Sequence, residues 1–253
     1  MGDKKVLMEK RNSIAKITLN RPEALNALDE ELLAELMVAL DDVEKDDSVK
    51  VVVITGVGRA FSAGRDLPGI LAGREWPGGA RYKKLEDLSK PVIAAVNGYC
   101  YTGGFEMAMC ADIIIASEKA VFGDTHARFG IIPGGGQTQR LPRQIGVKKA
   151  KELLFICDTI SAAEAERIGL VNRVVPDDKL EEAAMEIAEK IAKNIPEALK
   201  VIKFLINKGM YTDLETGLRI EAEMHEGHPI LPMGEGRKRI EALTDKRQRP
   251  SAD

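Results

Sequence analysis

Two glycine-containing segments carry the residues best suited to chemistry. Residues 61–67 read FSAGRDL, and residues 97–106 read NGYCYTGGFE. Each follows an apolar run that predicts a buried strand, and α/β proteins bind ligands beyond the carboxyl ends of such strands. Glycines at these turns let a ligand approach backbone N–H groups, and the start of a helix favours negative charge there. The two segments are therefore candidate halves of one site.

If the two turns face each other, they offer two N–H donors to a single oxygen atom. Such an oxyanion hole suits a thioester carbonyl that becomes an enolate. Glu106 lies one turn into the helix that the second segment opens, so its carboxylate could move a proton on the neighbouring carbon. A Gly-Gly pair before a helix is also common in simple packing, and a single helical glutamate is usually a solvated surface residue. The motif alone leaves both interpretations open.

The elements that must position these segments alternate between strands and helices. Continuous apolar runs at residues 51–55, 92–96 and 113–116 predict strands that are buried on both faces, and residues 6–19 predict two shorter strands. Leucines at three- and four-residue spacing predict an amphipathic helix that ends near residue 46. We therefore expect an α/β protein with largely parallel strands.

The pattern becomes helical from about residue 146 onward, apart from a short extended stretch at 171–175. We therefore divide the chain into an α/β core over residues 1–195 and a C-terminal helical region over residues 196–253. Residues 68–86, which are rich in glycine, predict a loop that either packs as plain surface or acts as a mobile lid.

Composition excludes several classes of protein. The 253 residues carry a net charge of -3, whereas nucleic-acid and membrane-surface binders usually need a basic excess. The three cysteines are an odd number without metal-type spacing, which indicates reduced thiols and no metal site. The N-terminus has no apolar signal region, and no apolar run reaches the roughly 18 residues of a membrane span. We expect a cytoplasmic protein.

The sequence resembles the enoyl-CoA hydratase/isomerase (crotonase) superfamily over nearly its whole length. The matching segments occur in order and at the family's spacing: NRP with LNAL, VVITG before FSAGRDL, AAVNGY before GGFEMA, FG before GIIPGG and TQRL, and SAAEA before GLVN. The resemblance implies an α/β fold, a crotonase-like spiral of ββα units, with a C-terminal helical trimerisation region. It also implies a homotrimer, often paired into a hexamer.

By motif position, the resemblance implies that the backbone N–H groups of Arg65 and Gly103 hold the thioester oxygen of an acyl-CoA substrate. Glu106 matches a catalytic glutamate of the family. Coenzyme A is then part of the substrate, and no separate cofactor is expected.

The resemblance also implies where coenzyme A binds. Its adenine end is expected near residues 62–66, which makes Ser62, Ala63 and Asp66 candidate CoA-binding residues. Lys246, in the last predicted helix, is a candidate phosphate contact for a neighbouring subunit. A solvated basic helix end is the alternative for Lys246.

The chain departs from the family at the second catalytic glutamate, where it has His126. Thr102 replaces the first glycine of the usual triple-glycine segment, and Gly134 stands where some members have an aspartate. A histidine titrates near neutral pH and can replace a glutamate as a proton donor. We therefore expect Glu106 and His126 to flank Cα and Cβ, one activating water and the other passing the proton. The alternative is that His126 only packs in its loop and Glu106 works alone.

The leading function is an enoyl-CoA hydratase, a lyase that adds water to a trans-2-enoyl-CoA. Three alternatives stay open: an enoyl-CoA isomerase that uses Glu106 alone, an acyl-CoA thioester hydrolase, and a non-catalytic acyl-CoA-binding protein. A dinucleotide-binding oxidoreductase is disfavoured because no third glycine follows Gly56 and Gly58 at the required place. A serine hydrolase is disfavoured because the chain lacks a Gly-x-Ser-x-Gly elbow. Acyl chain length stays unassigned.

Overall fold

The computed structural model describes residues 4–73, 80–227 and 234–248. The chain divides into two compact units, residues 1–191 and residues 192–253. The sequence pattern placed this boundary after residue 195. All strands among the described residues belong to the first unit, and the described part of the second unit beyond residue 195 is helical.

The first unit contains a six-stranded sheet. Its strands, in spatial order, are β1 (Val6–Arg11), β2 (Ile14–Leu19), β3 (Val51–Gly56), β5 (Val92–Val96), β7 (Ile113–Ser117) and β10 (Arg173–Val175). β1 pairs with β2 as an antiparallel hairpin, and every other pairing in this sheet is parallel. The central strand β5 is buried at all five positions, as its continuous apolar sequence predicted.

A second, four-stranded sheet is built from short strands. They are β4 (Ala60–Ser62), β6 (Tyr99–Tyr101), β8 (Val121–Gly123) and β9 (Thr159–Ser161). β4, β6 and β8 each follow a strand of the large sheet after a brief turn, so the chain repeats a unit of two strands and then a helical segment. Each glycine-containing segment includes residues of a short strand of this sheet, β4 or β6, and the turn that leads from that strand into a helix.

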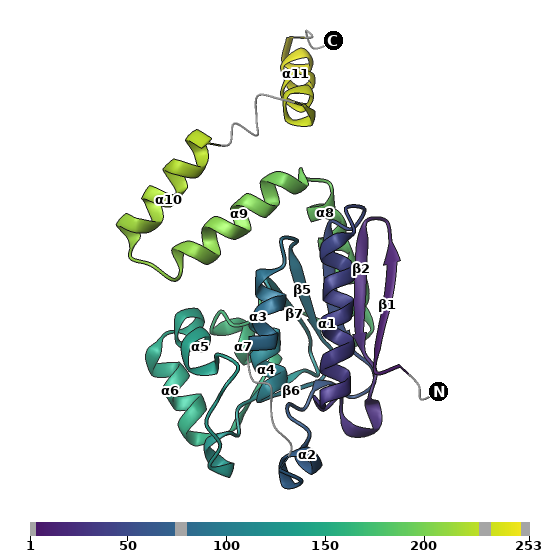
Figure 1. Ribbon diagram of the computed structural model, residues 1–253, viewed down its shortest axis with the longest axis vertical. Coiled ribbons are helices and arrows are strands. Elements are labelled where there is room, and N and C mark those ends of the chain that lie inside the picture. Colours follow the sequence, from purple (N-terminus) through teal and green to yellow (C-terminus); the bar gives the residue numbers. More distant parts are fainter. Residues whose placement is uncertain (1–3, 74–79, 228–233, 249–253) are drawn as a thin grey trace. The chain divides into compact units, whose positions relative to one another are not determined.

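Helices cover the sheets of the first unit (Figure 1). The longest, α1 (Glu30–Lys45), is capped at its N-terminus by Asp29, whose side chain accepts a hydrogen bond from the N–H of Leu32, and it buries its leucine stripe in the core. The others are α2 (Leu67–Leu71), α3 (Ala80–Asp87), α4 (Gly103–Ala108), α5 (Gln137–Ile145), α6 (Val147–Ile156), α7 (Ala162–Arg167) and α8 (Leu180–Ala192), which reaches the boundary between the units.

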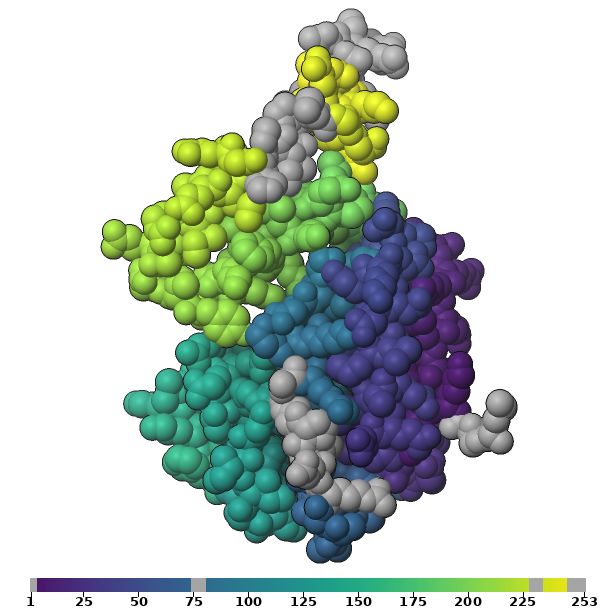
Figure 2. Space-filling view, in the orientation of Figure 1, coloured from purple at the N-terminus to yellow at the C-terminus, as the bar shows by residue number. Residues whose placement is uncertain are grey.

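The structure corrects three expectations about elements. The loop predicted over residues 68–86 contains most of α2 and all but the last residue of α3, and α3 buries Tyr82 and Leu85 where it packs against α1 and α4. α1 and α3 form adjoining parts of the surface in Figure 2. β9 was not predicted, because three residues are too few to show an alternating pattern. The sequence after the glycine pair predicted a helix that starts at Phe105, and α4 begins two residues earlier, at Gly103. Residues 74–79 lie outside the described residues, so the lid stays a prediction.

The second unit contains α9 (Pro196–Gly209), α10 (Leu214–Gly227) and α11 (Glu235–Gln248), and α9 packs against α10. Several of its large apolar side chains are exposed in the single chain, among them Ile206, Leu214 and Leu218. None of the helices among the described residues is long and apolar enough to cross a membrane.

Candidate active site

A cavity of about 500 Å³ in the first unit brings the predicted catalytic residues together. Arg65, Gly103, Glu106 and His126 all contribute to its wall, although they come from different turns of the chain. Much of the remaining lining is apolar, including Ile70, Phe129, Ile131 and Ile132. An apolar cavity with a few polar groups is the usual form of a small-molecule site.

The backbone at Arg65 is oriented by a parallel bridge to Leu28. Leu28 donates its N–H to the C=O of Gly64 (2.7 Å) and accepts from the N–H of Asp66 (3.1 Å). Because successive N–H groups of an extended strand point to opposite sides, the N–H of Arg65 faces away from Leu28. This geometry turns the Arg65 amide toward Gly103.

Gly103 is the first residue of α4, and an N–H in the first turn has no acceptor within its own helix. A Cβ atom added at Gly103 would lie 3.5 Å from the nitrogen of Arg65, so the two amides are neighbours at the cavity wall. Thr102 makes the turn into α4 with φ 44° and ψ -113°, a conformation that non-glycine residues rarely adopt. The two amides can therefore reach one oxygen atom of a ligand.

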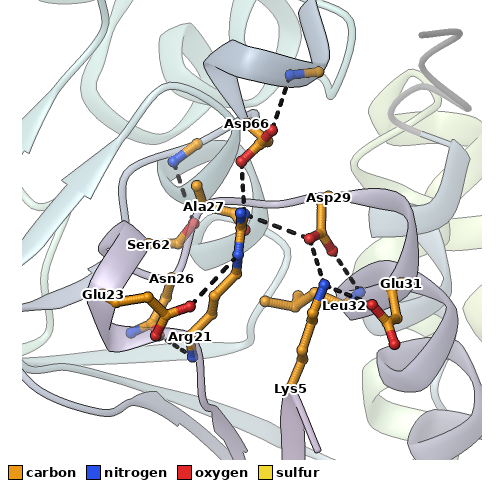
Figure 3. A network of polar contacts seen from close by, with 12 residues as sticks. Lys5, Arg21, Glu23, Asn26, Ala27, Asp29, Glu31, Leu32, Ser62 and Asp66 are labelled. Carbon is orange, nitrogen blue, oxygen red and sulfur yellow. Dashed lines mark hydrogen bonds and ion pairs between the residues drawn. The ribbon is translucent and has the colours of Figure 1, made fainter. Parts of the chain in front are cut away.

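An ion pair anchors the segment that carries Arg65 (Figure 3). The Arg21 guanidinium donates to Asp66 Oδ1 (2.7 Å) and to the C=O of Ala27 (3.1 Å), and Asp66 Oδ2 accepts from the N–H of Gly69 at the start of α2 (2.9 Å). Burial alone would raise the pKa of Asp66, but the bonds from Arg21 and Gly69 bring it below its ordinary value. Asp66 is therefore a carboxylate that joins α2 to the segment around Arg21.

Asn26, in the LNAL motif, connects this motif to the NRP motif and to the strand that precedes Arg65. It is fully buried, and its amide donates to the C=O of Ala60 (2.7 Å) and of Val57 (3.0 Å). Its Oδ1 accepts from the N–H of Arg21 (2.8 Å). These bonds tie the Arg21 segment to the turn and strand that precede Arg65, so both motifs support the same amide.

Glu106 lies in α4 and is only 3% exposed. Its Oε1 accepts from the N–H of Gly135 (2.7 Å) and, at a longer 3.3 Å, from the N–H of Gln137. Burial raises the pKa of Glu106 above its ordinary 4.5, while the Gly135 N–H, the charge of His126 and the Gln137 N–H oppose the rise. A carboxylate with a raised pKa, held at one oxygen, is a group that can exchange a proton with a ligand.

His126 forms a dyad with a buried carboxylate. Its Nδ1 lies 2.6 Å from Oδ2 of Asp124, which is 2% exposed, and its backbone N–H donates to Asp124 Oδ1 (3.1 Å). Burial alone would lower the pKa of His126, but the hydrogen bond and charge of Asp124 and the charge of Glu106 raise it above 6.5. With Nδ1 engaged by the carboxylate, Nε2 is the nitrogen left for a ligand.

Residues 9–247 match the family model described as Enoyl-CoA hydratase/isomerase. The chain belongs to the enoyl-CoA hydratase/isomerase family. It is 45% identical to the Short-chain-enoyl-CoA hydratase of Clostridium acetobutylicum over 86% of this chain and 87% of that one. It is 40% identical to the Crotonyl-CoA hydratase of Syntrophomonas wolfei, over 88% and 89% of the two chains.

Solved structures of the enoyl-CoA hydratase/isomerase family share the fold. The enoyl-CoA hydratase of Bacillus anthracis superposes with a TM-score of 0.90 at 39% identity, over 96% of each chain. A monofunctional enoyl CoA isomerase from M. smegmatis superposes with a TM-score of 0.76 at 35% identity, over 85% of this chain and 99% of that one. These matches confirm the resemblance inferred from the motifs and the expected crotonase-like α/β fold.

Of the residues expected to bind coenzyme A, some line the cavity and others do not. Ala63 and Asp66 line the cavity. Ser62 is fully buried, and its Oγ accepts from the N–H of Gly64 (3.2 Å), so it supports the turn from beneath. The side chain of Lys246 lies outside the described part of the structure. A contact of any of these residues with coenzyme A stays a prediction for this family member.

Three groups at the site escaped the sequence analysis. The buried carboxylate of Asp124 stands two residues before His126, and that spacing in one loop was a readable signal. No sequence signal pointed to the other two groups, which are the Gly135 N–H that bonds to Glu106 and the ring of Tyr82 in the cavity wall. They belong to α3 and to the loop before α5, which meet α4 only in the folded chain. Among the described residues, no three His, Cys, Asp or Glu side chains gather to hold a metal ion.

Proposed function

We propose that this protein is an enoyl-CoA hydratase that adds water across the Cα–Cβ double bond of a short trans-2-enoyl-CoA. The observation that carries the proposal is the presence, in one cavity, of two neighbouring amides and two acid-base groups, Glu106 and His126. Relatives named Short-chain-enoyl-CoA hydratase and Crotonyl-CoA hydratase support the reaction and the short acyl chain.

In the proposed mechanism, the thioester oxygen accepts hydrogen bonds from the N–H groups of Arg65 and Gly103. Water adds to Cβ while its proton passes to the Glu106 carboxylate, and the electron pair of the Cα–Cβ double bond shifts so that negative charge develops on the thioester oxygen. Each amide is expected to stabilise that enolate by about 3 kcal/mol relative to the neutral thioester. The His126 imidazolium then gives a proton to Cα, which completes the hydroxyacyl product, and solvent exchange resets both groups.

The electrostatics of the site support this division of roles. The pKa of His126 lies above 6.5, so the imidazolium that donates a proton persists further toward neutral pH than in a free histidine. The pKa of Glu106 is also raised, which makes its carboxylate a stronger base than an exposed glutamate. Activity then requires ionised Glu106 and protonated His126, which predicts a bell-shaped dependence of kcat/KM on pH.

The reaction is tested by incubating the protein with crotonyl-CoA and, separately, with a 3-enoyl-CoA in D₂O, and following the products by mass. We expect crotonyl-CoA to give a 3-hydroxyacyl-CoA with deuterium at Cα. Conversion of the 3-enoyl-CoA to a 2-enoyl-CoA without hydration would identify an isomerase, and release of free CoA would identify a thioester hydrolase. Binding of both thioesters without any product would contradict enzymatic activity altogether.

Self-association is part of the proposal. The exposed apolar side chains Ile206, Leu214 and Leu218 on α9 and α10 support an assembly, trimeric or hexameric, in which the C-terminal helices are covered by neighbouring subunits. Lys246 is proposed to contact the phosphates of coenzyme A bound to such a neighbour.

The role of the dyad is tested by Asp124→Asn. The asparagine keeps the size of the side chain but loses the charge that raises the pKa of His126. The pKa of His126 therefore falls, the imidazolium loses its proton at lower pH, and the alkaline limb of kcat/KM moves toward acid. The measurement is the pH profile of crotonyl-CoA hydration.

The matched control is Asp178→Asn, an exposed aspartate for which the profile should be unchanged. An alkaline limb that stays in place in Asp124→Asn would show that His126 does not control it.

A further inference from the structure

Tyr82 presents a buried hydroxyl for which the described residues supply no hydrogen-bond partner. The residue is 1% exposed and lines the cavity, and its hydroxyl makes no hydrogen bond among the residues that the structure describes. A buried hydroxyl that is left unpaired destabilises a protein, and the large majority of buried polar side-chain atoms are paired. An unpaired hydroxyl in the wall of a ligand cavity therefore points to a partner on the ligand.

The position of the hydroxyl places that partner at the reacting centre. A Cβ atom added at Gly103 would lie 2.8 Å from the Tyr82 oxygen and 3.5 Å from the Arg65 nitrogen, so the hydroxyl and the Arg65 amide approach the same point. On its other side, a Cβ added at Gly135 would lie 2.5 Å from Cε2 of Tyr82 and would also clash with Oε2 of Glu106. The phenol edge thus lies between the two amides and the catalytic carboxylate.

The chemistry of the phenol defines the kind of ligand atom. Burial raises the pKa of Tyr82 well above 10, the charges of Glu106 and Cys110 raise it further, and Arg65 opposes them only in part. The hydroxyl therefore keeps its proton and is a hydrogen-bond donor, which matches an oxygen acceptor. α3, which carries Tyr82, packs against α1 and α4, so the ring is held in place before a ligand arrives.

We propose that the Tyr82 hydroxyl donates a hydrogen bond to an oxygen atom of the bound acyl group, as a third donor beside the amides of Arg65 and Gly103. The inference rests on the proposed function only in taking an acyl-CoA as the ligand. Two oxygens of such a ligand can accept the bond: the thioester oxygen, and the β-oxygen that hydration adds. Tyr82 would then help to select acyl thioesters that present an oxygen at this point.

The test is Tyr82→Phe, which removes the hydroxyl and keeps the ring. The dissociation constants of butyryl-CoA, which has only the thioester oxygen, and of 3-hydroxybutyryl-CoA are measured by calorimetry. We expect the variant to bind at least one of them roughly 3- to 10-fold more weakly. An equal loss for both ligands assigns the bond to the thioester oxygen, and a loss for 3-hydroxybutyryl-CoA alone assigns it to the β-oxygen.

The ligand-free variant should unfold at the same temperature as the wild type or higher, because the hydroxyl bonds to none of the residues that the structure describes. Tyr99→Phe, at a tyrosine outside the cavity lining, is the control and should bind both ligands normally. Unchanged affinity of Tyr82→Phe for both ligands would overturn the proposal, and so would a lower unfolding temperature, which would reveal a partner within the protein. Neither measurement requires turnover, so a protein that binds acyl-CoA without hydrating it would still decide the question.

Discussion

Replacing Glu106 with glutamine is expected to lower kcat for crotonyl-CoA hydration by roughly 10³-fold. The amide cannot take the proton of the attacking water, and this loss is chemical rather than structural. Glutamine keeps an oxygen that accepts from the N–H of Gly135, the contact that holds Glu106 at 2.7 Å, so the fold around α4 should survive. The rate is followed by the loss of absorbance of the conjugated thioester.

Two measurements separate loss of chemistry from loss of structure in Glu106→Gln. The variant should still bind butyryl-CoA, because the amides of Arg65 and Gly103 are untouched. Glu118→Gln, at an exposed glutamate, should retain wild-type activity. If Glu106→Gln hydrated crotonyl-CoA at more than about a tenth of the wild-type rate, Glu106 would not be the main general base.

Replacing His126 with glutamine is expected to lower kcat/KM by roughly 10²-fold and to remove the alkaline limb of the pH profile. The raised pKa of His126 makes the imidazolium the proton donor to Cα, and glutamine has no proton to give. Glutamine can still donate an amide hydrogen bond to Asp124, which limits the cost of burying that carboxylate. The measurement is the full pH profile with crotonyl-CoA.

The double variant Glu106→Gln, His126→Gln tests whether the two groups act in one reaction. If they do, the double variant should lose little more activity than Glu106→Gln alone, because the first loss already disables the step that the second group serves. A His126→Gln variant with full hydration rate would contradict the two-residue scheme. Glu106 would then work alone, as the sequence alternative allowed.

Much of the fold could be predicted from local patterns of apolar residues in the sequence. The apolar runs that became β3, β5 and β7 were found to within a residue at their ends, because a strand buried on both faces leaves a continuous apolar signature. The helices α8, α9 and α10 were found for a similar reason, since their apolar positions recur at helical spacing. α3 was missed, because its sequence is highly charged and its burial of Tyr82 depends on α1 and α4 rather than on periodicity.

The sequence by itself determined the family, the two glycine turns and the presence of Glu106 and His126, because short motifs in a fixed order indicate each of them. The tertiary structure alone decided how they act together. In the folded chain the N–H of Gly135 donates to Glu106, and the Arg65 amide lies close to Gly103. The Tyr82 hydroxyl lies near the same residue, Gly103. These contacts join residues that are distant along the chain, so no local sequence pattern predicts them. Packing and backbone hydrogen bonds bring the residues together in the folded protein.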